Sequence, residues 1–203
     1  FSLVIFAVYC SLSLGMAWDE PLHYYVGKNR LKYFFSLGKY EYVQLLHFRY
    51  YPGFYDTLSA FISQIVPIKY EVHIHHINNL FFSLLTIFGI SKITGRLFNK
   101  KVGKIVFLIS FLNPIFFGHM SINPKDTIIA FSNVWTTYFI IRYLQTQHLE
   151  QKRKYFTTLI GIAIGFGVGR HPIFLATLLP ILILLLHILH PIQPIHSHHC
   201  SVA

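Results

Sequence analysis

Two neighbouring carboxylates follow the first apolar run of the sequence. Asp19 and Glu20 stand in "WDEP", directly after residues 1–18. Neighbouring carboxylates in a partly dry site repel each other, which raises the pKa of one of them toward the range of a general base. The alternative is a pair of acids that only ends a helix at the water boundary.

A second polar group is the stretch "EVHIHHINN" at residues 71–79. Imidazole together with carboxylate suits zinc, so His73, His75 and His76 with Glu71 could ligate a metal. On a helix, however, residues 71 and 75 share a face while residue 73 points elsewhere, so at most two of these side chains converge. We therefore favour histidines that line a polar pocket over a zinc site.

The third group, "GHMSINPKD" at residues 118–126, has the pattern of a helix start. Asn123 is predicted to cap a helix that begins at Pro124 and places Lys125 and Asp126 in its first turn. A helix N-terminus with a lysine beside it favours an anion, phosphate above all, and Asp126 could orient that lysine. An ordinary capped helix is the alternative.

A fourth candidate is Arg170 in "GVGRHP", at the end of an apolar run. His171 and Pro172 are predicted to break the helix there, and a cation at that break could meet a phosphate. The alternative is an arginine that only extends toward the membrane surface.

Composition indicates the environment in which these residues work. Of 203 residues, 54% are hydrophobic and only 12% are charged, and the mean hydropathy is +0.51. Soluble domains carry about 25% charged residues, so the sequence predicts a membrane protein. The net charge of +10 does not indicate nucleic acid binding, because the basic residues stand in loops between apolar segments.

The apolar runs predict an all-α, multi-pass transmembrane helix bundle with five or six spans. The first run could instead be a signal peptide, since "GMA" is a passable cleavage site. The runs cover residues 1–18, 74–90, 105–117, 127–141, 156–168 and 172–189.

The connecting loops predict how the bundle is oriented. Residues 91–104 hold five basic residues and no acid, and residues 142–154 hold four basic residues and one acid. Both loops should therefore be cytoplasmic, which places 118–126 outside. Residues 19–72, aromatic and polar, are then the first extracytoplasmic loop, in which we expect short interfacial helices.

The two ends of the sequence differ from its middle. Because the first residue is not Met and already lies in an apolar run, we expect residues 1–190 to be the transmembrane region of a larger protein. Residues 191–203 form a His- and Pro-rich tail that we expect to be disordered, with metal binding as the alternative.

Five stretches together resemble the GT-C glycosyltransferases, of the dolichyl-phosphate-mannose protein mannosyltransferase and aminoarabinose transferase type. The resemblance covers about residues 1–175, and the Asp-Glu pair and "GHMSINPKD" are its most specific parts. The stretches are "WDEPLHYYVGK", "YYPGFYD", "EVHIHHINN", "GHMSINPKD" and "IGIAIGFGVGRHP".

The resemblance implies transfer of a sugar from a polyprenyl-phosphate donor to a protein or a lipid-linked glycan, with inversion, at the outer face of a bacterial plasma membrane. It implies that Asp19 is the general base and that Glu20 shapes the site. Lys125 and Arg170 would meet the lipid phosphate. The other expected substrate contacts are His75, His119, Asn123 and Asp126. An obligate metal is not expected, although some relatives use a divalent ion; membrane lipids are expected partners.

A transporter or another non-enzymatic membrane protein is the competing interpretation. It predicts charged residues near the middle of the spans. In this sequence the acids instead cluster near the ends of the predicted spans, five of the seven within residues 19–72. This distribution favours an active site at the membrane interface.

Overall fold

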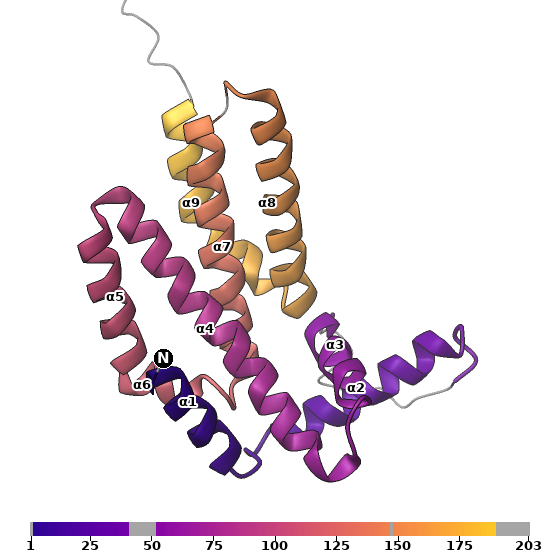
Figure 1. Cartoon of the computed structure of the whole chain (residues 1–203). Helices are drawn as coiled ribbons and strands as arrows, with labels where there is room; N and C mark the ends of the chain where they lie inside the picture. Colours follow the sequence, from indigo (N-terminus) through magenta and orange to yellow (C-terminus); the bar gives the residue numbers. More distant parts are fainter. Residues whose placement is uncertain (1, 41–51, 147, 190–203) are drawn as a thin grey trace, which may run out of the picture.

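The protein is built from helices throughout the part that the structure describes. The computed structural model describes residues 2–40, 52–146 and 148–189, and no strand occurs within these ranges (Figure 1). The helices are α1 (Ser2–Ser13), α2 (Glu20–Phe35), α3 (Phe54–Ser63), η1 (Ile68–Tyr70), α4 (Glu71–Leu97), α5 (Lys100–Leu112), α6 (Pro114–His119), α7 (Pro124–Thr146), α8 (Glu150–Arg170) and α9 (Ile173–Leu189). The predicted all-α class is therefore confirmed.

Asparagine side chains cap the first turns of α5 and α7. The side-chain oxygen of Asn99 accepts a hydrogen bond from the backbone N–H of Val102 at 2.9 Å, which caps α5. Asn123 caps α7 in the same way, accepting from the N–H of Asp126 at 3.2 Å. Such bonds satisfy N–H groups that have no partner inside the helix. The predicted cap at Asn123 is confirmed, and it fixes where α7 starts.

Helix α4 is the central element of the bundle. It contacts α1, α5 and α7, and α7 in turn packs along α8. A buried apolar cluster of Ala7, Leu80, Ile87, Phe111 and Met120 joins α1, α4 and α5 with the turn that follows α6. This packing fixes the start of α4 relative to the segments around it.

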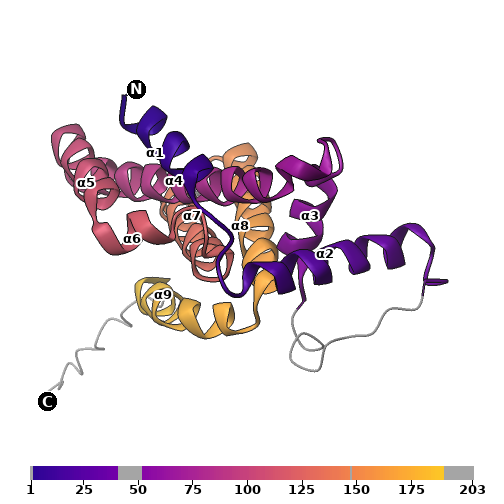
Figure 2. The same cartoon turned by 90° about the horizontal axis from the view of Figure 1, so that it is seen from below.

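The polar segments lie together at one end of the molecule. α2 and α3 lie at the lower end in Figure 1, next to the start of α4 and the end of α8. The α4–α5 connection and the start of α8 lie at the opposite, upper end. In Figure 2, α2 and α3 lie toward the right-hand end of α4, whereas α5 and α6 lie toward its left-hand end. The two basic loops of the sequence are thus far from the end that holds the candidate site.

One helix of the described chain is long and apolar enough to cross a membrane, the continuous segment Ile68–Leu97. Ser2–Ser13 and Ile173–Ile183 are apolar but shorter. α7 and α8 are long, but the first turns of both carry charged side chains, among them Asp126 and Glu150. The predicted five or six spans are therefore not all reproduced by length and hydropathy. The expected tail, 191–203, lies outside the described residues.

Candidate functional site

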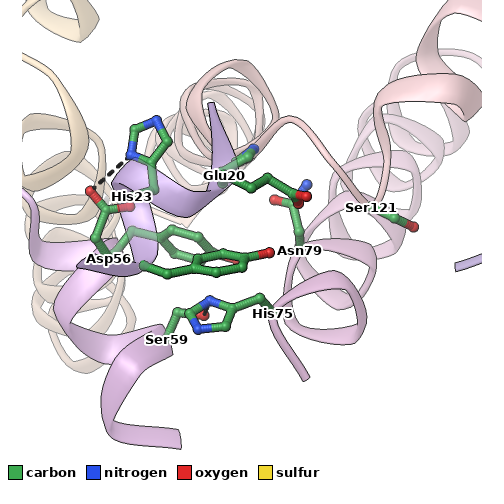
Figure 3. Close-up of a pocket in the computed structure, with 10 residues that line it drawn as sticks. Glu20, His23, Asp56, Ser59, His75, Asn79 and Ser121 are labelled. Atoms are coloured by element: carbon green, nitrogen blue, oxygen red, sulfur yellow. Dashed lines mark hydrogen bonds and ion pairs between the residues drawn. The ribbon is translucent and has the colours of Figure 1, made fainter. Parts of the chain in front are cut away.

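A small polar cavity lies where α2, α3 and α4 meet the start of α7. Its volume of about 10 Å³ is room for about one water molecule. Figure 3 shows side chains from all three helices converging on it. The lining residues are Glu20, His23, Tyr24, Tyr55, Asp56, Ser59, His75, Asn79, Ser121 and Pro124.

Glu20 is buried against α4, where it meets a histidine. Only 2% of Glu20 is exposed, and its carboxylate lies 2.9 Å from Nε2 of His76. Nδ1 of His76 faces the backbone oxygen of Ser11 at 3.1 Å, and a carbonyl oxygen can only accept. The two ring nitrogens of His76 therefore each face an oxygen atom, one of Ser11 and one of Glu20. The contact of Glu20 with His76 fastens the first turn of α2 to α4.

A second buried network joins α2, α3 and α8. Nδ1 of His23 lies 3.3 Å from Oδ2 of Asp56, as Figure 3 shows. The other carboxylate oxygen of Asp56 accepts a hydrogen bond of 2.6 Å from Nη1 of Arg170. Arg170 is 1% exposed, and its Nε and Nη2 have no hydrogen-bond partner within the described residues. Arg170 is thus a buried cation, two of whose nitrogen atoms have no acceptor within the described residues.

Asp56 is held in its charged form by these partners. Burial on its own would raise the pKa of the Asp56 carboxyl, but the hydrogen bond from His23 and the charge of Arg170 outweigh it and lower that pKa. An ionised carboxylate can only accept hydrogen bonds. The proton between His23 and Asp56 therefore belongs to Nδ1 of His23.

Asp19 lies at the edge of this network and is open to solvent. It is the residue before α2, its side chain is 56% exposed, and Oδ2 lies 3.9 Å from Nε2 of His23. The side chains of these two neighbouring acids therefore lie in different environments. Glu20 is buried on His76, and Asp19 remains at the surface beside His23.

His75 lies on the opposite wall of the cavity. Its ring stacks on the ring of Tyr24 with centroids 3.9 Å apart, and its Nδ1 lies 2.7 Å from the Ser59 hydroxyl. Burial, followed by the charge of Glu20, raises the pKa of the Tyr24 phenol. Lys28 donates a hydrogen bond of 2.6 Å to Glu71, which ties α2 to α4 a second time.

Three predicted site residues line a separate, wider groove beside the start of α7. His119, Asn123 and Asp126 share this groove of about 520 Å³ with the apolar side chains of Ile115 and Phe116. Nδ2 of Asn123 donates to the Asp126 carboxylate at 2.9 Å. The structure thus brings these three residues together, although not at the cavity of Glu20 and His75.

The charges of Lys125 and Arg170 both affect the imidazole of His171. The pKa of His171 is lowered by burial first and then by the positive charges of Lys125 and Arg170. His171 directly follows α8, and Lys125 is in the first turn of α7. Two cations from different helices therefore lie within electrostatic reach of one position.

Several residues of this site were not selected from the sequence. His23 and Asp56 became recognisable only when the helices brought them together, and His76 had been considered only as a possible metal ligand. The spacing of four residues between Asp19 and His23 is a signal that could have been used, since such residues share a helix face. Among the described residues, no three potential metal ligands lie close enough together to hold an ion.

Comparison with known proteins identifies a family for most of the chain. The family model of dolichyl-phosphate-mannose-protein mannosyltransferases matches residues 61–199. No curated protein and no solved structure matches the chain. The matched range begins at the end of α3, so Asp19, Glu20 and Asp56 precede it, whereas their partners His76 and Arg170 lie within it.

Proposed function

The chain belongs to the dolichyl-phosphate-mannose-protein mannosyltransferase family, and from that premise we propose that it transfers a sugar from a polyprenyl-phosphate donor to an extracytoplasmic acceptor. Members of this family are glycosyltransferases and integral membrane proteins. The observation that carries the proposal is the pairing of Glu20 with His76 and of Asp56 with Arg170. These pairs attach α2 and α3, and with them the neighbouring Asp19, to helices that the family model matches.

Asp19 is the proposed general base. Its carboxylate is exposed enough to meet an acceptor hydroxyl, whereas the Glu20 carboxylate is enclosed. The hydroxyl proton passes to Asp19, the acceptor oxygen bonds to the anomeric carbon, and the bond from that carbon to the phosphate oxygen breaks with inversion. The bonding electrons leave with the lipid phosphate, whose growing charge needs cations or donors. Glu20 fixes the turn that presents Asp19.

Lys125 is the proposed first contact of the lipid phosphate. It stands in the first turn of α7, where the helix dipole favours anions. We propose that Arg170 reaches the same phosphate through Nε and Nη2, because Nη1 is committed to Asp56. A phosphate near His171 would be within the field of both cations.

The remaining predicted contacts belong to two places. His119, Asn123 and Asp126 line the groove with the apolar wall, which suits a donor whose polar head adjoins a prenyl chain. His75 lines the cavity behind Asp19 and keeps the walls of that cavity in place. The proposed acceptor is a protein or a lipid-linked glycan. The proposed reaction needs no metal ion, because a carboxylate base and two cations carry its charge changes.

The test is to reconstitute the complete protein in liposomes with labelled polyprenyl-phosphate sugars, mannose first. The proposal predicts labelled acceptor together with free polyprenyl phosphate. Movement of the intact donor to the other leaflet, without release of polyprenyl phosphate from any donor, would instead identify a transporter and overturn the proposal.

A further inference from the structure

From the charges at the end of the molecule opposite the candidate site, we propose that the protein binds the headgroups of anionic phospholipids there. This surface, the basic end, consists of residues 91–104, 142–146 and 148–154. The α4–α5 connection and the start of α8 both lie at the upper end in Figure 1. The loop charges predict on which side of the membrane this end lies, and the proposal adds the class of lipid that it selects. It does not depend on the proposed sugar transfer.

The basic end carries a large excess of positive charge. Residues 91–104 hold five basic residues and no acid, and residues 142–154 hold four basic residues and Glu150. Glu150 pairs with Lys154 at 2.8 Å, the one ion pair that the described residues form at this end. The other cations are Lys92, Arg96, Lys100, Lys101, Lys104, Arg142, Lys152 and Arg153. A densely charged anionic partner therefore fits this surface.

Exposed apolar side chains stand among these cations. Arg142 is half-buried, and the other seven are exposed. The exposed fractions of the apolar side chains are 56% for Leu97, 71% for Phe98, 41% for Leu149 and 60% for Tyr155. Cations mixed with aromatic and aliphatic side chains are typical of the headgroup region of a membrane. A nucleic acid would leave the apolar side chains in water, whereas a membrane surface covers them.

Four helices change from apolar to basic residues where they reach this end. The apolar run of α4 ends at residue 90 and is followed by Lys92, and that of α7 ends at residue 141 and is followed by Arg142. On α5 and α8 the order is reversed, with Lys104 directly before the run from residue 105 and Lys154 two positions before the run from residue 156. In a membrane, such boundaries lie at the depth of the lipid phosphates.

Contacts between the helices hold these four boundaries together. The Ser91 hydroxyl on α4 donates a hydrogen bond of 2.8 Å to the backbone of α5. Nε of Arg96 donates to the side-chain oxygen of Gln145, which joins α4 to α7. The Arg142 guanidinium on α7 lies over the ring of Phe156 on α8, 5.2 Å from its centroid. The cations of all four helices therefore form one surface.

The charge of this surface selects one class of phospholipid. Each Lys or Arg near an anionic membrane surface strengthens binding about fivefold. Phosphatidylcholine has no net charge and gains no such attraction, whereas phosphatidylglycerol carries one negative charge. Because salt screens exposed charges over about 10 Å at 0.1 M, the preference for the anionic lipid should decrease as salt is added.

The first experiment measures which lipids stay bound to the complete protein. Native mass spectrometry counts them after release from micelles that hold equal amounts of phosphatidylglycerol and phosphatidylcholine with the same acyl chains. Wild type should retain phosphatidylglycerol in preference. The test variant replaces three exposed lysines of α5 and should lower this preference at least about fivefold; its substitutions are Lys100→Gln, Lys101→Gln and Lys104→Gln.

The matched control removes the same charge from the other end of the molecule. It replaces three exposed lysines in or near α2 and η1, Lys32→Gln, Lys39→Gln and Lys69→Gln. Since both triple variants have the same net charge, a difference between them depends on where the charges lie. The control should keep the wild-type preference. A second test variant, Lys152→Gln with Arg153→Gln at the start of α8, should lower the preference as well, and it retains the test if the α5 variant fails to fold.

A second experiment reads the same binding as stability. In nanodiscs of phosphatidylcholine alone, the α5 variant should unfold at the wild-type temperature. Adding phosphatidylglycerol should raise the unfolding temperature of wild type and of the control by a few degrees at low salt, and should not raise that of the α5 variant.

Three results would overturn the proposal. The first is equal retention of the two lipids by wild type. The second is the same change of preference in the α5 variant and in the control, because net charge alone would then explain it. The third is displacement of phosphatidylglycerol by a single-stranded oligonucleotide at equal phosphate concentration, which would identify a nucleic-acid surface. Each of these results leaves the proposed sugar transfer untouched.

Discussion

Asp56 is the residue on which two helices depend. Its carboxylate bonds to His23 on α2 and to Arg170 on α8. Little in the sequence distinguishes Asp56 from the other acids of residues 19–72. Its role is visible only in the fold, because its partner Arg170 is 114 positions away in the chain.

Asp56→Asn should destabilise the protein in a pH-dependent way. Its pKa is lowered in the folded state, so its charge contributes stability above the ordinary value of about 3.9, and this is lost as pH falls through the folded-state pKa. We expect a loss of about 3 kcal/mol at pH 7, because Arg170 is left buried without its counter-ion. Thermal unfolding in lipid should show the difference from wild type shrink below about pH 4.

The matched control for this substitution is Glu150→Gln. Glu150 pairs with Lys154, but both side chains are largely exposed, so its removal should cost less than about 1 kcal/mol. If Asp56→Asn were as harmless as Glu150→Gln at pH 7, Asp56 would not anchor the network.

Lys125→Ala should weaken donor binding more than it slows chemistry. A charged hydrogen bond to phosphate contributes about 1.5 kcal/mol or more, so the KM for the polyprenyl-phosphate sugar should rise about 10-fold. Steady-state kinetics with varied donor measure this, and Lys100→Ala at the exposed start of α5 is the control. An unchanged donor KM would remove Lys125 from the phosphate site.

At the scale of elements, the site depends on how closely α2 and α3 pack. Gly27 on α2 allows this approach, because a Cβ there would overlap the backbone carbonyl of Asp56. The helix start at Pro124 could be predicted from the Asn123 cap and the proline. The α2–α3 contact could not be predicted, because a glycine is the only sign in the sequence that two backbones approach each other closely.

Gly27→Ala should therefore separate α2 from α3 and shift Asp56. We expect a cost of about 1–3 kcal/mol, the usual range for overpacking, and a lowered kcat because the start of α2, next to the proposed base Asp19, shifts with the helix. Denaturant unfolding and the transfer assay measure the two effects.

Gly161→Ala is the control for this substitution within α8. No atom lies within 4 Å of the Cβ it would add, and alanine is the better helix former by up to about 1 kcal/mol. Gly161→Ala should be neutral or stabilising. If Gly27→Ala behaved in the same way, the packing of α2 on α3 would be looser than the structure has it.

At the scale of the whole molecule, the pattern of charges predicted which segments lie together better than the pattern of apolar runs predicted the number of spans. Residues 19–72 were expected on the same side as the start of α7 and the end of α8, and in Figure 1 α2 and α3 lie at the same end as the start of α7 and the end of α8. The six apolar runs agree in order with α1, α4, α5, α7, α8 and α9, but within the described residues only Ile68–Leu97 passes as a span on its own. Polar side chains such as Asn133 and Thr177, which bond to each other between α7 and α9, lower the hydropathy of individual helices and are recognisable as partners only in the fold.

The orientation in the membrane gives a prediction for the whole chain. With Cys10→Ala and Cys200→Ala as background, Leu37→Cys should react with an impermeant thiol reagent in intact cells, because α2 is proposed to lie outside. Lys152→Cys should react only after permeabilisation. Mass-shift labelling reads both positions, and the reverse pattern would place the site in the cytoplasm.

The most direct test of the central claim is the rate of sugar transfer by Asp19→Asn, measured in the complete reconstituted protein beside wild type and Glu150→Gln. If Asp19 is the general base, the substitution should lower kcat at least about 100-fold, with thermal stability near that of wild type because Asp19 is mostly exposed. Glu150→Gln should transfer sugar as wild type does. Transfer by Asp19→Asn at the wild-type rate would contradict the claim that the chemistry takes place at the start of α2.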